Sequence, residues 1–408
     1  MKKSIIITIG NELTSGHTVN SNAAYIARFL AKFGIINQKI VAIEDKKEKI
    51  VDDLDEAINY DYVFVTGGLG PTHDDITKQV VAEYFDTELK ESSRLKKELE
   101  TFLKERDVAL SKVNYEQALF PDKAKIVPND IGTAAGMHFH EKNTDYYFMP
   151  GVPAEMERML EKYIALDLEG NGAQAMNHYK KVRTFGIPES ELYTGLASWI
   201  TENNNVKVAF LPRMPGVDIV LESQQKKSIN RTLEYIKSNF ADFIFGYNDD
   251  QPYQIVGEKL DEQNLTIAVA ESCTGGLIGH ALTNRSGSSQ YFQGGVIAYS
   301  NKVKIEMLGV NTDTIKKNGA VSRETALEMA AGVRKRFNVD IGLSTTGIAG
   351  PTGGSQEKPV GTVWAGFATR NKQSALHYIF NKNRIQNKQA FKKFALINTI
   401  KFLDGRLS

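Results

Sequence analysis

A serine in a glycine-rich turn, followed by two lysines, is the part of this chain most able to do covalent chemistry. Ser272 follows the apolar run at residues 267–270, and Cys-Thr-Gly-Gly comes directly after it at residues 273–276. A serine hydroxyl needs a base to become a nucleophile. Lys302 and Lys304 lie beyond the next apolar run, and a lysine can act as a base if desolvation or a nearby cation lowers its pKa. The pattern indicates an enzyme with a serine nucleophile and a lysine base.

Other interpretations of this turn stay open. Ser272 or Thr274 could simply cap the helix expected at residues 277–282, whose first N–H groups would otherwise suit a phosphate or an oxyanion. Cys273 is a rival nucleophile, but a small buried cysteine without a neighbouring base is the simpler interpretation. If the segment after the second apolar run is extended, its alternation gives only weak grounds for deciding whether Lys302 or Lys304 is the base.

A second glycine-rich loop, at residues 66–77, carries two adjacent acids, Asp74 and Asp75. It follows the strand-like run at residues 62–65, and open α/β sheets bind ligands at the carboxyl ends of their strands. Two acids there either cap the next helix or hold a divalent cation on a phosphate. Further loops that could complete the rim lie at residues 10–22, 129–136 and 149–155. We therefore expect a phosphate-ligand site in this part of the chain.

Three modules must position these loops. Short β-branched runs alternate with helical patterns over residues 1–168, which predicts βαβ units and a parallel sheet. Residues 175–250 form a small α+β module, and the βαβ alternation resumes over residues 252–408. The fold class is therefore α/β, with segments rich in Gly, Asn and Asp between the modules. The charged helix at residues 90–106 is expected to be a solvated surface rather than a partner site.

The composition of the chain argues against nucleic acid and membranes as partners and favours a reducing compartment. The net charge is +1, so no global field attracts nucleic acid or a membrane, and no basic and aromatic patch stands out. No apolar run approaches the length of a membrane-spanning helix, and the first residues are interpreted as a buried strand rather than a signal peptide. Cys273 is the only cysteine, which fits a reducing, cytoplasmic compartment. A homodimer is expected as the commonest oligomer.

These motifs, in this order, resemble those of the CinA family of competence- and damage-inducible proteins. The first module resembles molybdopterin-binding-like domains of the MoaB/MogA type through Gly-Asn-Glu-Leu at 10–13, Asn-Ser-Asn at 20–22 and Gly-Gly-Leu-Gly-Pro-Thr-His-Asp-Asp at 67–75. The last module resembles the nicotinamide-nucleotide amidase domain PncC through Ala-Glu-Ser-Cys-Thr-Gly-Gly at 270–276, Ser-Gly-Ser-Ser at 286–289, Tyr-Ser-Asn-Lys-Val-Lys at 299–304 and Thr-Gly-Ile-Ala-Gly-Pro at 346–351. The resemblance covers essentially the whole chain.

For the last module, the resemblance implies hydrolysis of nicotinamide mononucleotide (NMN) to nicotinic acid mononucleotide and ammonia, without a cofactor. It implies that Ser272 is the nucleophile, that Lys304 is its base and that Tyr299 belongs to the catalytic group. The implied substrate-binding residues are Thr274, Gly275, Gly276, Ser288, Ser289, Asn301, Thr346, Gly347 and Arg384. The family often carries an acidic–Arg pair and a second Arg near the C-terminus. This chain has Asn383-Arg384 and Lys388 there, which leaves Arg384 as the expected phosphate contact.

For the first module, the resemblance implies a metal-dependent ADP-ribose pyrophosphatase. Its ligand site would include Glu12, Gly67, Gly68, Gly70 and Thr72. Asp74 and Asp75 would hold a divalent cation such as Mg, Mn or Co. The competing hypothesis is a molybdopterin-like ligand binder or a competence-associated protein without catalysis. The expected partners are NMN and ADP-ribose or a related phosphate ligand, with no nucleic acid and no membrane.

Overall fold

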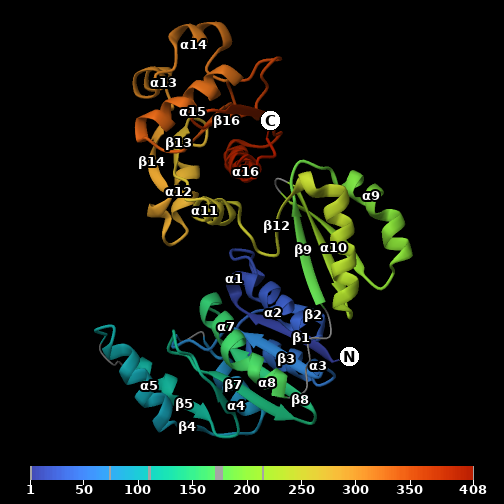
Figure 1. Ribbon diagram of the computed structural model, residues 1–408. Helices are drawn as coiled ribbons and strands as arrows, with labels where there is room; N and C mark the ends of the chain where they lie inside the picture. The colour runs from blue at the N-terminus through green and yellow to red at the C-terminus, as the bar shows by residue number, and fades with distance from the viewer. Residues whose placement is uncertain (1, 73–74, 109–111, 171–177, 214–215, 408) are drawn as a thin grey trace. The chain divides into compact units, whose positions relative to one another are not determined.

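The chain folds into two compact units, Met1–His178 and Tyr179–Ser408 (Figure 1). The computed structural model describes residues 2–72, 75–108, 112–170, 178–213 and 216–407. Within these residues, no helix combines the length and the apolar character needed to span a lipid bilayer.

The first unit is built on a six-stranded sheet with the order β2-β1-β3-β8-β7-β6. Four neighbouring strands, β2, β1, β3 and β8, are parallel, β7 pairs antiparallel with β8, and β6 pairs antiparallel with β7. The sequence predicts the parallel part, but short strands such as β6 carry too weak a pattern to reveal the antiparallel edge. The bounds are β1 Lys3–Ile9, β2 Ile36–Ile43, β3 Tyr62–Thr66, β6 Lys125–Val127, β7 Gly136–Glu141 and β8 Thr144–Met149.

Helices cover both faces of this sheet because successive residues of its strands point to opposite sides. In β3, Tyr62 and Phe64 pack towards α2, α7 and α8, whereas Val63 and Val65 pack towards α3 and α4. The helices are α1 Asn11–Thr14, α2 Ser21–Lys32, α3 Lys47–Ala57, α4 Thr77–Tyr84, α7 Pro153–Met159 and α8 Ala165–Gly170. A π-helical turn, Leu160–Ile164, joins α7 to α8.

A smaller lobe stands at the side of the first unit (Figure 1). It consists of the two-stranded sheet β4-β5 and the helix α5, followed by a short helical segment. Its bounds are β4 Leu89–Glu91, α5 Ser93–Lys104, α6 Lys112–Tyr115, a 3-10 turn Glu116–Ala118 and β5 Leu119–Pro121.

The second unit begins with a β-α-β-β-α-β module whose sheet order is β10-β11-β9-β12. This order is that of the ferredoxin-like split βαβ arrangement. The bounds are β9 His178–Thr184, α9 Glu189–Glu202, β10 Lys207–Arg213, β11 Gly216–Ser223, α10 Lys226–Phe240 and β12 Ile244–Tyr247. Phe185 and Phe245 of this module pack into the core of the C-terminal domain, with the Phe185 ring 6.0 Å from that of Phe394.

The C-terminal domain is a five-stranded sheet with the order β14-β13-β15-β16-β17. β14, β13 and β15 are parallel to one another. β16 pairs antiparallel with β15, and β17 pairs antiparallel with β16. The strands are β13 Ile267–Glu271, β14 Phe292–Ile297, β15 Ile341–Gly347, β16 Thr362–Ala368 and β17 Gln373–Ile379. Every residue of the interior strand β13 is buried, as expected for a strand covered on both faces.

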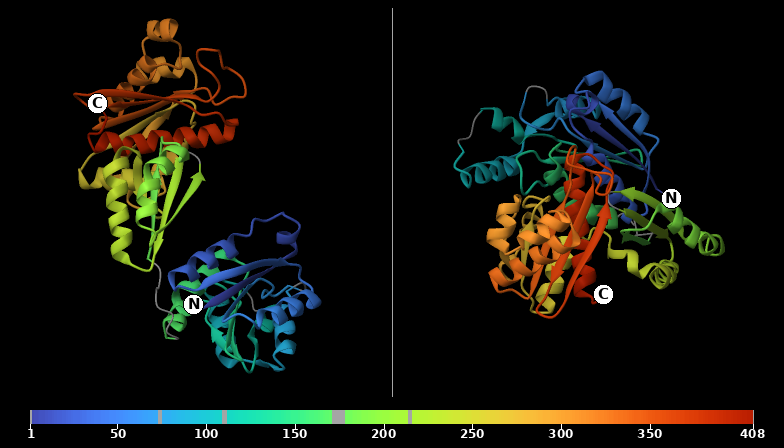
Figure 2. Two further views of the ribbon diagram at one scale, coloured as in Figure 1. Left: turned by 90° about the vertical axis from the view of Figure 1, so that its right-hand side faces the viewer. Right: turned by 90° about the horizontal axis from the view of Figure 1, so that it is seen from above.

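Helices lie on both faces of this second sheet, with the long α16 along one face and α15 on the other (Figure 2). Polar side chains cap several of their starts, such as Ser300 before α13 and Asn383 before α16. The bounds are α11 Pro252–Glu262, α12 Leu277–Thr283, a 3-10 turn Ser288–Gln290, α13 Asn301–Leu308, α14 Thr312–Asn318, α15 Arg323–Phe337 and α16 Arg384–Leu403.

Candidate active site

The carboxyl ends of three parallel strands meet at one edge of the C-terminal sheet. Glu271, the last residue of β13, pairs with Ile297 of β14 and with Thr345 of β15. The residues that follow these strands therefore gather at the same edge, which is where open α/β sheets bind ligands. Ser272 stands at the centre of this edge, and its N–H donates to the Thr345 carbonyl over 2.9 Å.

Ser272 and Lys304 are in contact at this edge. Lys304 Nζ lies 3.0 Å from Ser272 Oγ and also donates to the carbonyls of Ala298 and Tyr299 over 2.8 and 3.2 Å. Ser272 is 7% exposed and Lys304 only 1%. The predicted nucleophile and base are thus brought together in a buried environment.

A helix, rather than an extended segment, separates the two candidate lysines. Ser300 Oγ accepts from the Val303 N–H and caps α13, which begins at Asn301. Positions 302 and 304 are two residues apart on a helix of 3.6 residues per turn, so their side chains point to different sides. The Lys302 side chain is 77% exposed, and Lys304 turns inward.

The surroundings of Lys304 suit a neutral amine. Burial lowers the pKa of its ammonium below the usual value, and among the described residues no carboxylate forms an ion pair with it. In its neutral form the amine would have two N–H groups for the two backbone carbonyls, which would leave its lone pair for the Ser272 hydroxyl. Lys304 can therefore accept the proton of the serine hydroxyl.

Cys273 is a poor nucleophile in this structure. Its side chain is buried, and that burial raises the pKa of the thiol to about 12. Because the thiolate is the reactive form of cysteine, such a thiol is inert near neutral pH. The simpler interpretation of Cys273 as a small buried residue agrees with this environment.

Glu271 is a residue of this site that the sequence analysis missed. Its carboxylate is 2% exposed and accepts the N–H groups of Gly276, Ile278 and Gly279 over 2.9, 3.1 and 2.8 Å. It therefore fills the start of α12, where an anion was expected to bind. An acid at the end of an apolar run, one residue before the serine, is the only sequence signal for this role.

Two left-handed glycines let the turn fold back onto the Glu271 carboxylate. Gly275 and Gly276 have φ angles of 61° and 96°, which disfavour side chains with a Cβ. Within the described chain, the N–H groups of Cys273, Thr274 and Gly275 have no hydrogen-bond acceptor. These three donors belong to the turn directly after Ser272, whereas the Gly276 N–H is already used by Glu271.

Cationic side chains of α16 line the rim of the turn. Arg384 Nη2 donates to the Tyr299 hydroxyl over 3.2 Å, and its Nη1 donates to the Gly350 carbonyl over 2.6 Å. Lys388 follows one turn later, and its Nζ lies 3.5 Å from the position that a Cβ on Gly275 would take. Tyr299 is 63% exposed, so this rim is open to a ligand.

Three further predicted residues lie at the same edge but are held by protein groups. Thr274 is fully buried, and its hydroxyl bonds that of Thr345 over 2.7 Å. The Thr346 hydroxyl donates to the Ala320 carbonyl over 2.7 Å. At Gly347 an added Cβ would stand 2.5 Å from the Thr362 carbonyl oxygen, so a side chain has no room there. These residues fix the shape of the edge.

Asn301 and the two predicted serines of the 286–289 motif lie apart from the centre of the edge. Asn301 is the exposed first residue of α13. Ser288 and Ser289 precede β14, whose amino end pairs with Ile267 at the start of β13. They therefore lie at the opposite end of the strands from Ser272, roughly 15–20 Å away along the strand direction. The structure does not bring these two serines to the candidate nucleophile.

In the first unit, the predicted glycine loop follows β3. Gly67 and Gly68 have left-handed φ angles of 116° and 66°, and the Gly67 N–H donates to the Met149 carbonyl over 3.1 Å. Asp75 Oδ2 accepts from the N–H and the hydroxyl of Thr72 over 3.0 and 2.5 Å. This carboxylate therefore stabilises the loop that contains Gly70, and α4 has no side-chain cap.

Asp45 is a second residue that the sequence analysis missed. It follows β2, its Oδ2 accepts the Asn11 N–H over 3.0 Å, and its Oδ1 lies 3.5 Å from the position of an added Cβ on Gly68. Glu12 lies in the loop after β1, with Oε1 2.5 Å from an added Cβ on Gly10. Among the carboxylates of these loops, Asp45 is the one that lies close to Gly68, and Asp75 lies close to Gly70.

Metal binding at this loop stays a prediction. Asp74 lies outside the described residues. Among the residues that the structure does describe, no group of three or more His, Cys, Asp or Glu side chains could hold a metal ion. Lys78 lies in α4, the helix that follows this loop. Burial lowers the pKa of its ammonium group to about 8, and its Nζ donates to the Glu116 carbonyl over 3.1 Å.

Comparison with known proteins divides the chain in the same order as the modules. Residues 5–169 match the family "Probable molybdopterin binding domain", residues 179–246 match "Damage-inducible protein CinA KH domain", and residues 249–403 match "CinA C-terminal domain". The middle stretch contains no Gly-x-x-Gly, the loop with which KH domains clamp nucleotides.

Close relatives extend over the whole chain. A CinA-like protein of Chlorobium limicola is 39% identical over 410 residues, which cover 96% of this chain and 95% of the relative. A CinA-like protein of Cytophaga hutchinsonii is 36% identical over 97% of this chain and 96% of its own. Among solved structures, a competence/damage-inducible protein of Agrobacterium tumefaciens is 38% identical over 38% of this chain and 97% of its own, with a TM-score of 0.35.

Proposed function

Because this chain belongs to the CinA family of competence- and damage-inducible proteins, we propose that its C-terminal domain hydrolyses the carboxamide of NMN. One observation carries the proposal: Lys304 Nζ lies 3.0 Å from Ser272 Oγ, and both side chains are buried. A serine hydroxyl beside a desolvated lysine is a nucleophile with its general base, as amide hydrolysis requires.

The reaction would proceed in two steps. Ser272 Oγ attacks the carboxamide carbon and gives its proton to neutral Lys304. The carbon–nitrogen bond breaks, Lys304 returns the proton to the nitrogen, and ammonia leaves an acyl ester on Ser272. Water then attacks this ester, Lys304 takes a proton from the water, and that proton returns to Ser272 Oγ as nicotinic acid mononucleotide leaves. The N–H groups of residues 273–275 would bind the oxyanion in both steps.

Two cations would select a substrate with a phosphate. Arg384 and Lys388 lie one turn apart on α16 and approach the rim at Tyr299 and Gly275. Arginine and lysine are the usual ligands of phosphate groups. Lys388 stands where the family often has a second arginine. This chain would therefore bind the phosphate through the planar guanidinium of Arg384 and the compact ammonium of Lys388.

Release of ammonia from NMN by the full-length chain tests this proposal. Nicotinamide riboside, which lacks the phosphate, is the matched control substrate. NMN should be turned over with a much lower KM than nicotinamide riboside, and Arg384→Ala should remove most of that difference. A chain that releases no ammonia from NMN would instead support the competing hypothesis of a binding protein without catalysis.

For the N-terminal domain we infer a phosphate ligand, with metal-dependent cleavage of ADP-ribose as the candidate activity. The supporting observation is the left-handed Gly67–Gly68 turn at the carboxyl end of β3, with Asp45 close to Gly68 and Asp75 close to Gly70. Carboxylates and a glycine turn suit a pyrophosphate bridged by a divalent cation.

Turnover of ADP-ribose with Mg²⁺, Mn²⁺ or Co²⁺, and its loss on adding EDTA, tests this activity. Asp45→Asn should abolish turnover while leaving ammonia release from NMN unchanged. Binding of ADP-ribose without turnover would favour the alternative of a non-catalytic, molybdopterin-like ligand binder.

A further inference from the structure

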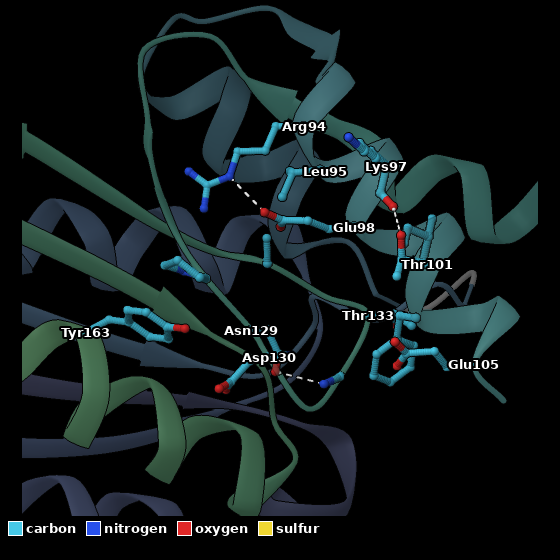
Figure 3. A pocket seen from close by; sticks show the side chains of 15 residues that line it. Arg94, Leu95, Lys97, Glu98, Thr101, Glu105, Asn129, Asp130, Thr133 and Tyr163 are labelled. Atoms are coloured by element: carbon cyan, nitrogen blue, oxygen red, sulfur yellow. Dashed lines mark hydrogen bonds and ion pairs between the residues drawn. The ribbon is translucent and has the colours of Figure 1, made fainter.

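A cavity of about 490 Å³ lies in the first unit, and several of its charged side chains are already paired (Figure 3). One face of α5 lines it, so the expectation that the helix at residues 90–106 is only a solvated surface is incomplete. Arg94 Nε is bonded to Glu98 Oε1 over 2.9 Å, and Asp130 accepts from Arg158 Nη2 over 3.0 Å. The charges of this cavity therefore do not indicate one class of ligand.

A second cavity, of about 830 Å³, lies in the C-terminal domain. It is formed where α11, α15 and α16 end, beside the start of β15 and the turn between β16 and β17. Ser272 lies at the other end of β15, roughly 15–20 Å away along the strand direction. Cavities of this size hold small molecules, and this one is separate from the candidate active site.

Two guanidinium groups without an ion pair line this second cavity. Arg334 lies in the last turn of α15, and Arg370 lies in the turn that follows β16. Among the described residues, the two side chains make a single hydrogen bond, from Arg334 Nη1 to the Val339 carbonyl over 3.5 Å. Each guanidinium has five N–H groups, so most of these donors are available to a ligand. Guanidinium groups bind carboxylates and phosphates through two parallel hydrogen bonds.

Three amide side chains add neutral donors to the same lining, those of Gln263, Asn338 and Asn371. All three residues are exposed, and within the described chain no protein group is hydrogen-bonded to their amides. Asn338 ends α15 with a left-handed φ of 51°, a position where glycine is common. Asparagine tolerates this conformation and keeps a hydrogen-bonding group at the cavity.

One acid, Asp340, belongs to the lining, and the protein already uses it. Its Oδ2 accepts from the N–H and the hydroxyl of Thr266 over 2.8 and 2.7 Å, which hold the pKa of this carboxyl below its usual value. Two arginines against one aspartate leave the lining with an excess of positive charge. Lys372 adds to it from beside the cavity, with Nζ 6.0 Å from the centre of the Phe402 ring. The cavity therefore attracts an anion.

Another part of the wall is apolar. Leu265, Phe402 and Leu403 are half-buried and line the cavity. The Phe402 ring is stacked on that of Phe367, with 5.3 Å between the centroids and 21° between the planes, so its position is fixed. A flat apolar group can lie against this part of the wall while an attached anion reaches the arginines.

We propose that this cavity binds a small organic oxyanion, a phosphate monoester or a carboxylate carried by a flat apolar group. The two arginines would hold the oxyanion, the amides would donate to its remaining oxygen atoms, and Phe402 with Leu265 would contact the flat group. The cavity would then be a second ligand site of the C-terminal domain. It does not depend on the proposed hydrolysis of NMN, because it shares no residue with the serine–lysine edge.

Modification of arginines by phenylglyoxal gives a test with single-residue resolution on the full-length chain. The chain is labelled alone and with phenyl phosphate, benzoate or inorganic phosphate, and peptide mass spectrometry measures the rate at each arginine. Arg336 is the internal control, because it is exposed on the same helix as Arg334 and does not line the cavity.

Phenyl phosphate or benzoate near saturation should slow the modification of Arg334 and Arg370 by about tenfold and leave Arg336 unchanged. The probe that protects at the lower concentration identifies the oxyanion as a phosphate or a carboxylate. Inorganic phosphate should need a concentration at least about tenfold higher than phenyl phosphate, because it cannot use the apolar wall.

Substitutions test whether the two arginines act together. In the Arg370→Gln chain, protection of Arg334 should require at least about tenfold more ligand, because charge-assisted hydrogen bonds are lost. Lys335→Gln is the charge-matched control, since this exposed residue is next to Arg334 and does not line the cavity. Arg384→Ala, at the proposed phosphate contact of the amidase site, should leave the protection of Arg334 unchanged. Thermal denaturation checks that each variant is folded.

Three results would overturn the proposal. The first is that neither phenyl phosphate nor benzoate protects Arg334 and Arg370. The second is equal protection of Arg336, which would mean that the probes act on exposed arginines in general. The third is that inorganic phosphate protects as well as phenyl phosphate, which would remove the role of the apolar wall.

Discussion

Replacing Lys304 with methionine should remove NMN deamidation without unfolding the domain. The methionine side chain has a similar length but no base, so Ser272 Oγ keeps its position and loses its proton acceptor. Loss of a general base usually costs a factor of about 10²–10⁴, or about 2.7–5.5 kcal/mol of transition-state stabilisation. Ammonia release from NMN measures kcat/KM, and Lys302→Met is the control, because that side chain is exposed on the same helix.

Stability should respond to this substitution in a pH-dependent way. Burial lowers the pKa of Lys304 in the folded chain, so the unfolded chain holds the proton more tightly. Wild-type stability should therefore rise as the pH increases from the folded pKa towards the ordinary value of 10.5, and the Lys304→Met variant should lack this rise. Denaturant unfolding at several pH values measures the difference.

The pH profile of activity gives the decisive result. Since only the neutral amine is a base, kcat/KM should rise through the lowered pKa of Lys304 and level off above it. Lys304→Arg keeps a positive charge that is not lost at accessible pH, so it should be as inactive as Lys304→Met. Near-normal activity of Lys304→Arg would show that the lysine supplies charge and not proton transfer, and an unchanged pH profile in Lys304→Met would show that another group sets the profile.

Three further substitutions test separate parts of the structure. Ser272→Ala should lose NMN deamidation by a factor on the order of 10⁴ or more, whereas Cys273→Ala should keep most of it, and the reverse result would make the cysteine the nucleophile. Glu271→Gln should lower both the melting temperature and kcat, because an amide oxygen replaces a carboxylate that accepts three N–H groups, at a cost of about 1–3 kcal/mol; an unchanged kcat would restrict this residue to a structural role. Lys78→Met should stabilise the chain by up to about 3 kcal/mol at pH 7, since the pKa of the buried lysine is lowered from 10.5 to about 8. That gain should shrink as the pH rises above 8, because the wild-type lysine is then buried in its neutral form, and urea unfolding at pH 7 and pH 10 measures both values.

The position of Ser272 at the centre of the candidate site could be predicted from the sequence, because it requires little knowledge of the strand order. A buried apolar run that breaks at Ser272 fixes the residue at the end of a strand, and parallel strands put their ends at one edge. The choice between Lys302 and Lys304 could not be made in the same way. It depends on Ser300, whose hydroxyl starts a helix one residue later and turns only one lysine inward.

Other parts of the site depend on contacts that no local pattern contains. In the sequence, Glu271 is only an acidic residue at the end of an apolar run. Its role becomes visible in the structure, where the turn that contains Gly276 folds back and donates N–H groups to its carboxylate. Asp45 is far from the glycine loop in sequence, and only the position of β2 beside β1 brings it there. Ser288 and Ser289 show the opposite case, since a recognisable motif lies at the wrong end of β14 for contact with Ser272.

The packing of Phe185 and Phe245 has a practical consequence for recombinant fragments. Composition suggests a cut near residue 250, but that cut would remove two aromatic side chains from the core around Phe394 and leave an apolar surface exposed to water. Burial of each such ring contributes roughly 1.5–3 kcal/mol, and its loss invites aggregation. A fragment that starts near residue 178 keeps this shared core intact and is the better choice for expressing the serine–lysine site alone.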